Sequence, residues 1–197
     1  MFTIKFSVDS QRVKNHWVSK YKQEDLAPEV SAQTELFRKS VEQKWGKREM
    51  EVLSLIEKFT GLDIAGHFSV FILPPELEMA QYIDEENIEW GYGELYPNSI
   101  VVGLAHELIH CLTHDFYSTL SDDDKWIFHA LIYLSADEEL RFTLNGRAEY
   151  FTSPVLDTYH ERLIETAKRI LPFWKEYLSN PKGENIINLF EKIKDNT

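Results

Sequence analysis

Cysteine is almost absent from this sequence, and long apolar runs are missing altogether. Cys111 is the single cysteine, so no disulfide can form within the chain, which argues against a small secreted scaffold built on disulfides. No apolar segment approaches the roughly 20 residues that a helix needs to cross a bilayer. The first residues show no basic segment followed by a long apolar one, so we see no signal peptide and expect a cytoplasmic protein.

Positive charge is also scarce. Lys and Arg number 21 against 33 Asp and Glu, which gives a net charge of -12. Nucleic acids and anionic membrane surfaces are bound by clustered basic residues, and here Lys and Arg are scattered along the chain. We therefore expect neither nucleic acid nor a membrane as a partner. The remaining composition is ordinary for a globular protein, with 43% hydrophobic residues among 197.

The apolar pattern predicts a single α+β domain over residues 1–197. Its strands fall in about residues 1–98 and its later helices in about 99–197. Strands are expected at 2–8, at 67–73 and, as a sheet edge, at 88–96. Helices are expected at 31–59 with a division at Gly46 and a stop at Gly61, then at 100–118, 121–144, 155–179 and 183–195. Residues 10–30 are polar and mixed, and no element is predicted there.

The helix expected at 100–118 carries the segment His106-Glu107-Leu108-Ile109-His110. Two histidines four residues apart lie on one face of a helix, where both imidazoles can reach a single metal ion. Glu107 is rotated from His106 by about 100° around the helix axis. It therefore flanks the metal without sharing the ligand stripe, which is the place for a general base that acts on water. The metal that this pattern predicts is Zn²⁺.

The surroundings of the segment strengthen this interpretation. His106, Glu107 and His110 are the only polar side chains from residue 100 to residue 112, and a helix that is apolar on nearly all sides is expected to be buried. Burying three such groups without partners costs several kcal/mol, whereas a metal and a water satisfy all of them together. The alternative is a buried His-Glu-His cluster that is hydrogen-bonded and holds no metal.

A third ligand has to come from another element, because His114 lies about 12 Å along the axis from His106 at ~1.5 Å per residue. On a projection of the next helix, Glu138 falls on an apolar stripe, Glu139 falls about 100° away, and His129 falls nearly opposite. If the stripe faces the motif helix, Glu138 points at the metal, and Glu139 stays open as the alternative. The stripe consists of Ile127, Leu131 and Leu134.

These residues resemble the gluzincin metallopeptidases, which are zincins with a glutamate on a later helix as their third ligand. The resemblance covers about residues 88–145 and implies a zincin-like fold, with zinc bound by His106, His110 and Glu138 and with Glu107 as the base. It also implies that an edge strand upstream of the motif binds an extended substrate. Members of the family often have Asn-Glu at the third ligand, where this chain has Asp137-Glu138.

Gluzincins often supply a tyrosine or histidine after the third ligand to stabilise the developing oxyanion. Tyr150, Tyr159, His160 and Arg147 are candidates here, and we favour Tyr159 and His160 as further catalytic residues. Tyr159 aligns with the apolar side chains of the following helix, so core packing explains it equally well.

The expected function is that of a zinc-dependent hydrolase, a metallopeptidase whose substrate is a peptide or protein. The alternative is a catalytically inactive zinc-binding interaction module. A third possibility is a metal-free helical domain in which the motif arose by chance.

Overall fold

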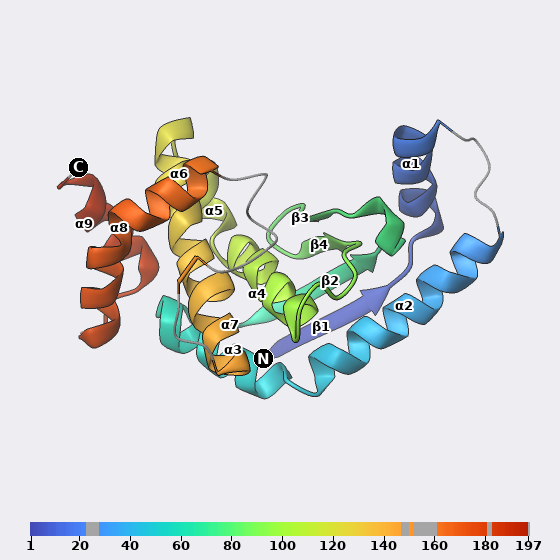
Figure 1. The fold of residues 1–197 in the computed structure, drawn as a ribbon, viewed down its shortest axis with the longest axis horizontal. Coiled ribbons are helices and arrows are strands. Elements are labelled where there is room, and N and C mark those ends of the chain that lie inside the picture. Colours follow the sequence, from blue (N-terminus) through green and yellow to red (C-terminus); the bar gives the residue numbers. More distant parts are fainter. Residues whose placement is uncertain (23–27, 147–149, 152–160, 181–182, 197) are drawn as a thin grey trace.

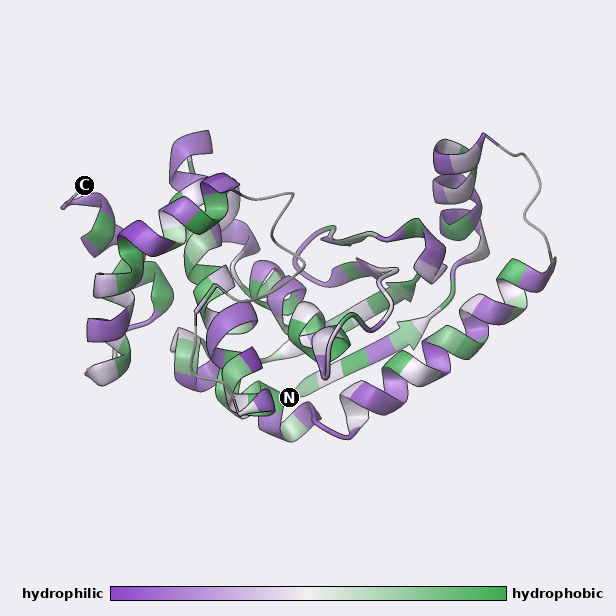
Figure 2. Ribbon diagram, in the orientation of Figure 1, coloured by the Kyte–Doolittle hydropathy of each residue, from purple (hydrophilic) through white to green (hydrophobic). Residues whose placement is uncertain are grey.

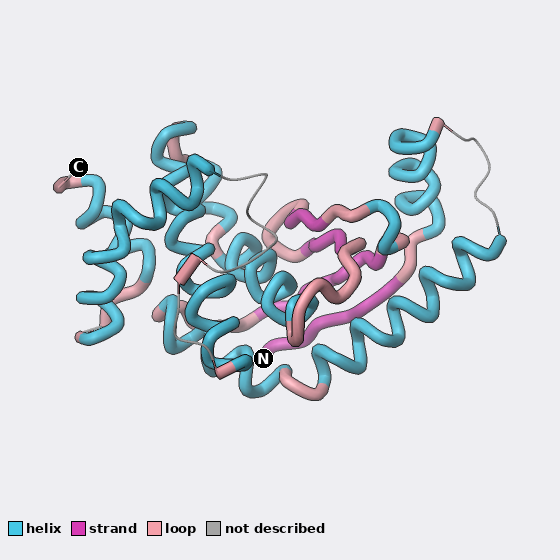
Figure 3. Tube along the Cα trace, in the orientation of Figure 1, coloured by secondary structure: helices cyan, strands magenta, loops and turns pink. Residues whose placement is uncertain are grey.

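The computed structural model describes residues 1–22, 28–146, 150–151, 161–180 and 183–196. A small sheet lies between helices in this structure, and helices make up most of the described chain (Figure 1; Figure 3). The expected α+β class is therefore confirmed. None of the described helices is long and apolar enough to span a bilayer.

The sheet has four strands in the order β1-β2-β4-β3. β1 (Phe2–Ser7), β2 (Gly66–Ile72) and β4 (Asn87–Trp90) are parallel, and β3 (Ala80–Tyr82) pairs antiparallel with β4. The strands predicted at 2–8 and 67–73 are confirmed. In β2, alternate residues face the core, which buries Phe68, Val70 and Ile72.

The prediction of an edge strand at 88–96 is wrong. β4 ends at Trp90 and lies inside the sheet, and the edge next to it is β3. The neighbouring β2 ends just before Pro74 and Pro75, and proline has no N–H to extend a ladder. β4 therefore has no partner on that side beyond Trp90. β3 escaped prediction because three residues are too few to show an alternating pattern.

Helices α2 (Pro28–Gly46) and α3 (Glu49–Thr60) each pack against α4 (Ser99–Leu112), and α2 and α4 also contact the strands. The predicted division after Gly46 is confirmed. The predicted stop at Gly61 is confirmed as well, because this residue ends α3 with a left-handed φ of 65°. In Figure 2 the long α2 carries both hydrophobic and hydrophilic stretches, as expected for a helix that covers a core on one side only.

Helix α1 (Ser10–Tyr21) was not predicted, because its sequence is polar. The Asp9 side chain accepts hydrogen bonds from the N–H groups of Gln11 and Arg12 and so begins the helix. Arg12 then donates a 2.7 Å hydrogen bond to the buried carboxylate of Glu89 on β4. This ion pair lowers the pKa of Glu89, although burial alone would raise it.

The remaining helices follow α4 along the chain: α5 (His114–Ser118), α6 (Asp122–Tyr133), η2 (Leu134–Leu140), α7 (Arg141–Asn145), α8 (Glu161–Ser179) and α9 (Ile186–Lys194). The helix predicted over 121–144 corresponds to α6, η2 and α7, which run on without a break, with Ser121 as the predicted N-cap and a stop at Gly146. The middle part, η2, is a π-helix. Residues 155–160 of the helix predicted at 155–179 lie outside the described residues.

Helix α4 lies at the centre of the main core, as its composition predicted. Its apolar side chains are almost fully buried, and His110 is only 4% exposed. The core around it draws on the sheet and on helices from both halves of the chain, so we treat the chain as one folding unit. Its largest fully buried side chains include Trp45, Ile56, Ile72, Ile88, Leu104, Leu108, Phe128, Trp174 and Phe190.

Gly103 on α4 is required by a close contact with the sheet. A Cβ at this position would lie 2.3 Å from the Cη2 atom of Trp90. We expect Gly103→Ala to destabilise the fold by about 1–3 kcal/mol through overpacking, which outweighs the roughly 1 kcal/mol that alanine gains over glycine in a helix. Urea unfolding of the variant measures this change.

Gly46→Ala is the matched control, because nothing lies within 4 Å of a Cβ at the end of α2. We expect its free energy of unfolding to stay the same or to rise slightly. An equal response of the two variants would contradict the packing argument.

Candidate metal centre

Three imidazoles converge where α4 crosses α6. His106 and His110 come from α4 and His129 comes from α6, and a nitrogen of each ring lies within 4.8 Å of the other two. The Nε2 atoms of His106 and His129 are 3.1 Å apart. These three form the candidate metal site among the residues that the structure describes.

The distance between the His106 and His129 nitrogens is compatible with a tetrahedral zinc ion. Zinc–nitrogen bonds of about 2.0–2.1 Å place two tetrahedral ligands about 3.3 Å apart, close to the 3.1 Å between His106 and His129. Three imidazoles are also a donor set that zinc accepts readily, and three protein ligands leave a fourth position for water or substrate. The residues present therefore fit the ion that the sequence predicted.

Asp137 holds His106 in the orientation that a metal requires. Its Oδ2 atom lies 2.5 Å from Nδ1 of His106. An ionised carboxylate only accepts hydrogen bonds, so Nδ1 carries the proton, and in the neutral tautomer the lone pair of Nε2 then faces His129. Burial lowers the pKa of His106, but the Asp137 carboxylate outweighs this effect and the net shift is upward.

The π-helix η2 explains how Asp137 and His129 reach the same ring. In a regular α-helix, two residues eight apart differ by about 80° around the axis. η2 begins at Leu134, between these two residues, and its wider turns rotate less per residue. This brings Asp137 back toward the face that carries His129.

His110 is oriented by aromatic rings rather than by a hydrogen bond. Its Nδ1 atom is buried and has no hydrogen-bond partner among the described residues. The Tyr82 ring stacks on it with centroids 4.7 Å apart and an angle of 4° between the planes, and the Tyr117 ring meets it edge-on. Burial, followed by the neighbouring His106 and His129, holds the pKa of His110 well below 6.5, so its ring is neutral and suited to bind a cation.

Glu107 lies beside the three histidines and reaches the edge of the sheet. Its Oε2 atom accepts a 2.8 Å hydrogen bond from the backbone N–H of Tyr82 on β3. Burial raises the pKa of Glu107, although His106 and the Tyr82 N–H oppose the rise. A raised carboxylate pKa suits a group that has to accept and release a proton near neutral pH.

The structure does not bring the predicted ligand Glu138 to this cluster. Its carboxylate is fully buried on another side of η2, where it accepts hydrogen bonds from the Tyr133 hydroxyl, from Arg141 and from the Phe151 N–H. The Glu139 carboxylate points in a third direction and accepts hydrogen bonds from the Tyr150 hydroxyl and the Trp174 indole N–H. The projection assumed a regular α-helix, and η2 changes the direction of each of these acidic side chains.

Of the other residues considered for the site, the structure describes Tyr150 and His114 only. Tyr159 and His160 lie outside the described residues, as does Arg147. Tyr150 donates its hydroxyl to Glu139. His114 begins α5 and approaches Glu85 at 4.0 Å, and it is not a member of the histidine cluster.

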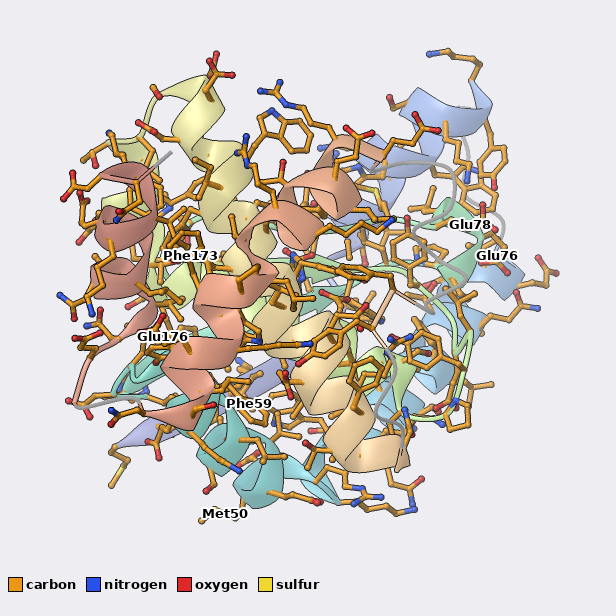
Figure 4. All side chains as sticks on the ribbon, turned by 60° about the vertical axis from the view of Figure 1, so that its left-hand side comes forward. Met50, Phe59, Glu76, Glu78, Phe173 and Glu176 are labelled. Carbon is orange, nitrogen blue, oxygen red and sulfur yellow. The ribbon has the colours of Figure 1, made fainter. Side chains whose placement is uncertain are left out.

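The histidines line the wall of a cleft with a volume of about 700 Å³. Strand β3 and the residues just before it line the cleft as well. Glu78 lies at the surface on the turn between β2 and β3, with its side chain 74% exposed (Figure 4). Aromatic side chains make up much of the remaining lining: Tyr82, Trp90, Tyr92, Tyr96, Tyr117 and Tyr133.

Comparison of the chain with known protein families, with curated proteins and with solved structures found no match. The expected zincin-like fold and the gluzincin resemblance therefore rest on the residues themselves.

Removal of one imidazole tests which residues bind the metal. We expect His129→Ala to lose stoichiometric zinc uptake, because two ligands remain of three, and we expect His114→Ala to keep it as a control. Elemental analysis after equilibration with zinc measures both. If Glu138→Gln loses zinc while His129→Ala retains it, the glutamate is the third ligand and the histidine cluster is not the site.

The hydrogen bond that His106 donates to Asp137 should tune the affinity of the site. We expect Asp137→Asn to weaken zinc binding about 10–100-fold, because the His106 ring loses the carboxylate that orients it. Competition with a chromophoric chelator measures the dissociation constant. Asp115→Asn on α5 is a control of the same chemistry away from the cluster, and an equal loss in both variants would contradict the role of Asp137.

Proposed function

We propose that this chain is a zinc-dependent hydrolase that cleaves peptide bonds, with zinc held by His106, His110 and His129 and with Glu107 as the general base. One observation carries the proposal: three imidazole nitrogens converge beside a half-buried carboxylate on the wall of an open cleft. In the gluzincin resemblance the third ligand would be Glu138, so the proposal keeps the motif and replaces that ligand.

Held by these three imidazoles, zinc would lower the pKa of water toward ~7 and would polarise a carbonyl group. Glu107 accepts the proton of the attacking water and later returns it to the leaving amine. Its raised pKa favours both directions of transfer, since the carboxylate must be basic enough to take the proton and acidic enough to give it back. Asp137 stabilises any positive charge that develops on His106.

The edge strand favours a peptide as the substrate. β3 pairs with β4 on one side only, and it lines the cleft next to Glu107. An extended peptide can bind along such an edge through main-chain groups other than the Tyr82 N–H, which already donates to Glu107, and this places its carbonyl groups along the cleft. The open cleft also favours a hydrolase over a closed zinc site that serves only to hold the fold.

Substitution of Glu107 separates an enzyme from an inactive zinc-binding module. We expect Glu107→Gln to bind zinc in the same ratio as the wild type and to lose about 10²–10⁴-fold in kcat. A screen of peptide substrates with mass-spectrometric detection identifies the reaction, and elemental analysis gives the metal content.

Glu78→Gln is the control, because this carboxylate lines the same cleft but is exposed and away from the cluster. Turnover that survives in Glu107→Gln would refute the role of the base. Zinc uptake without any peptide cleavage by the wild type would favour the interaction module, and absence of zinc uptake would favour the metal-free domain.

A further inference from the structure

We propose that Tyr82 is a positioning residue that holds two parts of the centre at once, Glu107 through its backbone N–H and His110 through its ring. The inference rests on the proposed function, since it assigns a role to the edge strand within that same site. Tyr82 is the last residue of β3, and it lines the cleft.

The backbone contact follows from the pairing of the edge strand. Ile83 donates to the Asn87 carbonyl, and the Met79 carbonyl accepts from Gly91, so these residues turn their main-chain groups toward β4. Alternation along an antiparallel strand turns the N–H of Tyr82 the other way, out of the sheet. There it meets Oε2 of Glu107 at 2.8 Å. The carboxylate is thus held between its own helix and the strand.

The ring contact supplies what His110 lacks. A histidine that binds a metal usually donates its other N–H to a carboxylate or carbonyl, as His106 does to Asp137. For His110, Nδ1 is buried and unpartnered among the described residues. The Tyr82 ring lies nearly parallel to the imidazole, at 4.7 Å and 4°. Stacking on this ring, with Tyr117 edge-on at 5.3 Å, restricts the rotation of the imidazole.

Three substitutions at Tyr82 separate the ring from the N–H. Tyr82→Phe keeps both, so we expect zinc affinity and kcat near those of the wild type. Tyr82→Ala keeps the N–H and loses the ring, so we expect zinc binding to weaken about 10-fold or more. Tyr82→Pro loses both, so we expect the zinc affinity of the alanine variant and a further fall in kcat of about 10-fold with little change in KM.

Ala80→Pro is the matched control for proline in this strand. Its N–H has the same outward direction by alternation, and proline is tolerated on an edge strand where the N–H is not needed by the ladder. We expect this variant to keep the zinc affinity of the wild type. Its kcat is not the readout, because β3 is proposed to bind the substrate. Circular dichroism shows whether each variant is folded.

The backbone contact has a second measurement that does not need proline. The Tyr82 amide proton should move upfield in the nuclear magnetic resonance spectrum of Glu107→Ala, because it loses a carboxylate acceptor. This test holds even if Tyr82→Pro fails to fold.

Two results would overturn the inference. One is a Tyr82→Ala variant that binds zinc as tightly as the wild type, and the other is a Tyr82 amide proton that does not respond to Glu107→Ala. In both cases the proposed function stands if the wild type binds zinc and cleaves peptides. A wild type that takes up no zinc would refute the proposed function and this inference together.

Discussion

The structure depends on the cost of burying polar groups in α4. This helix lies in the centre of the core, so its apolar faces meet the sheet, α3 and α6. The polar side chains of His106, Glu107 and His110 would be expensive there without partners. The fold provides hydrogen-bond partners for two of them, Asp137 and His129 for His106 and the Tyr82 N–H for Glu107. For His110 it provides a stacked ring, while Nδ1 has no hydrogen-bond partner among the described residues. The cleft and the surrounding elements are arranged around that requirement.

The π-helix η2, which follows α6, directs neighbouring side chains into different surroundings. Three successive acidic residues on η2 face three different partners. Asp137 meets His106 of the candidate metal centre, Glu138 enters the core beside Tyr133 and Arg141, and Glu139 meets Tyr150 and Trp174. Burial raises the pKa of Glu138, although its hydrogen-bond partners oppose the rise. The wider turns of a π-helix, which often occur at functional sites, separate the directions of these side chains.

Much of this arrangement could be predicted from the sequence where a pattern is local. Alternation predicted β1, an apolar run ended by two prolines predicted β2, glycines predicted the ends of α2 and α3, and apolar composition predicted the burial of α4. The prediction that His106 and His110 share one face of α4 needed only the geometry of a regular helix. Each of these depends on neighbours within about two turns of the chain.

The features that escaped prediction depend on contacts between distant segments. β3 has no pattern of its own and exists because β4 offers it a ladder. α1 is polar and is tied to β4 by Arg12 and Glu89. The convergence of His129 required the crossing of α4 with α6 and the irregular turns of η2. A signal was present nonetheless. From Trp126 to Leu134 the side chains are apolar except for those of His129 and Tyr133, so His129 is an isolated polar group on an apolar helix, like His106 and His110 on α4.

The contact between Glu107 and Tyr82 has a consequence for the solubility of the chain. A strand at the edge of a sheet exposes unpaired N–H and C=O groups, and these can recruit the edge of another molecule and begin aggregation. β3 is only three residues long, and its outward N–H at Tyr82 is already bound to a carboxylate. The residue proposed as the base thus also occupies a main-chain donor through which copies of the chain could pair.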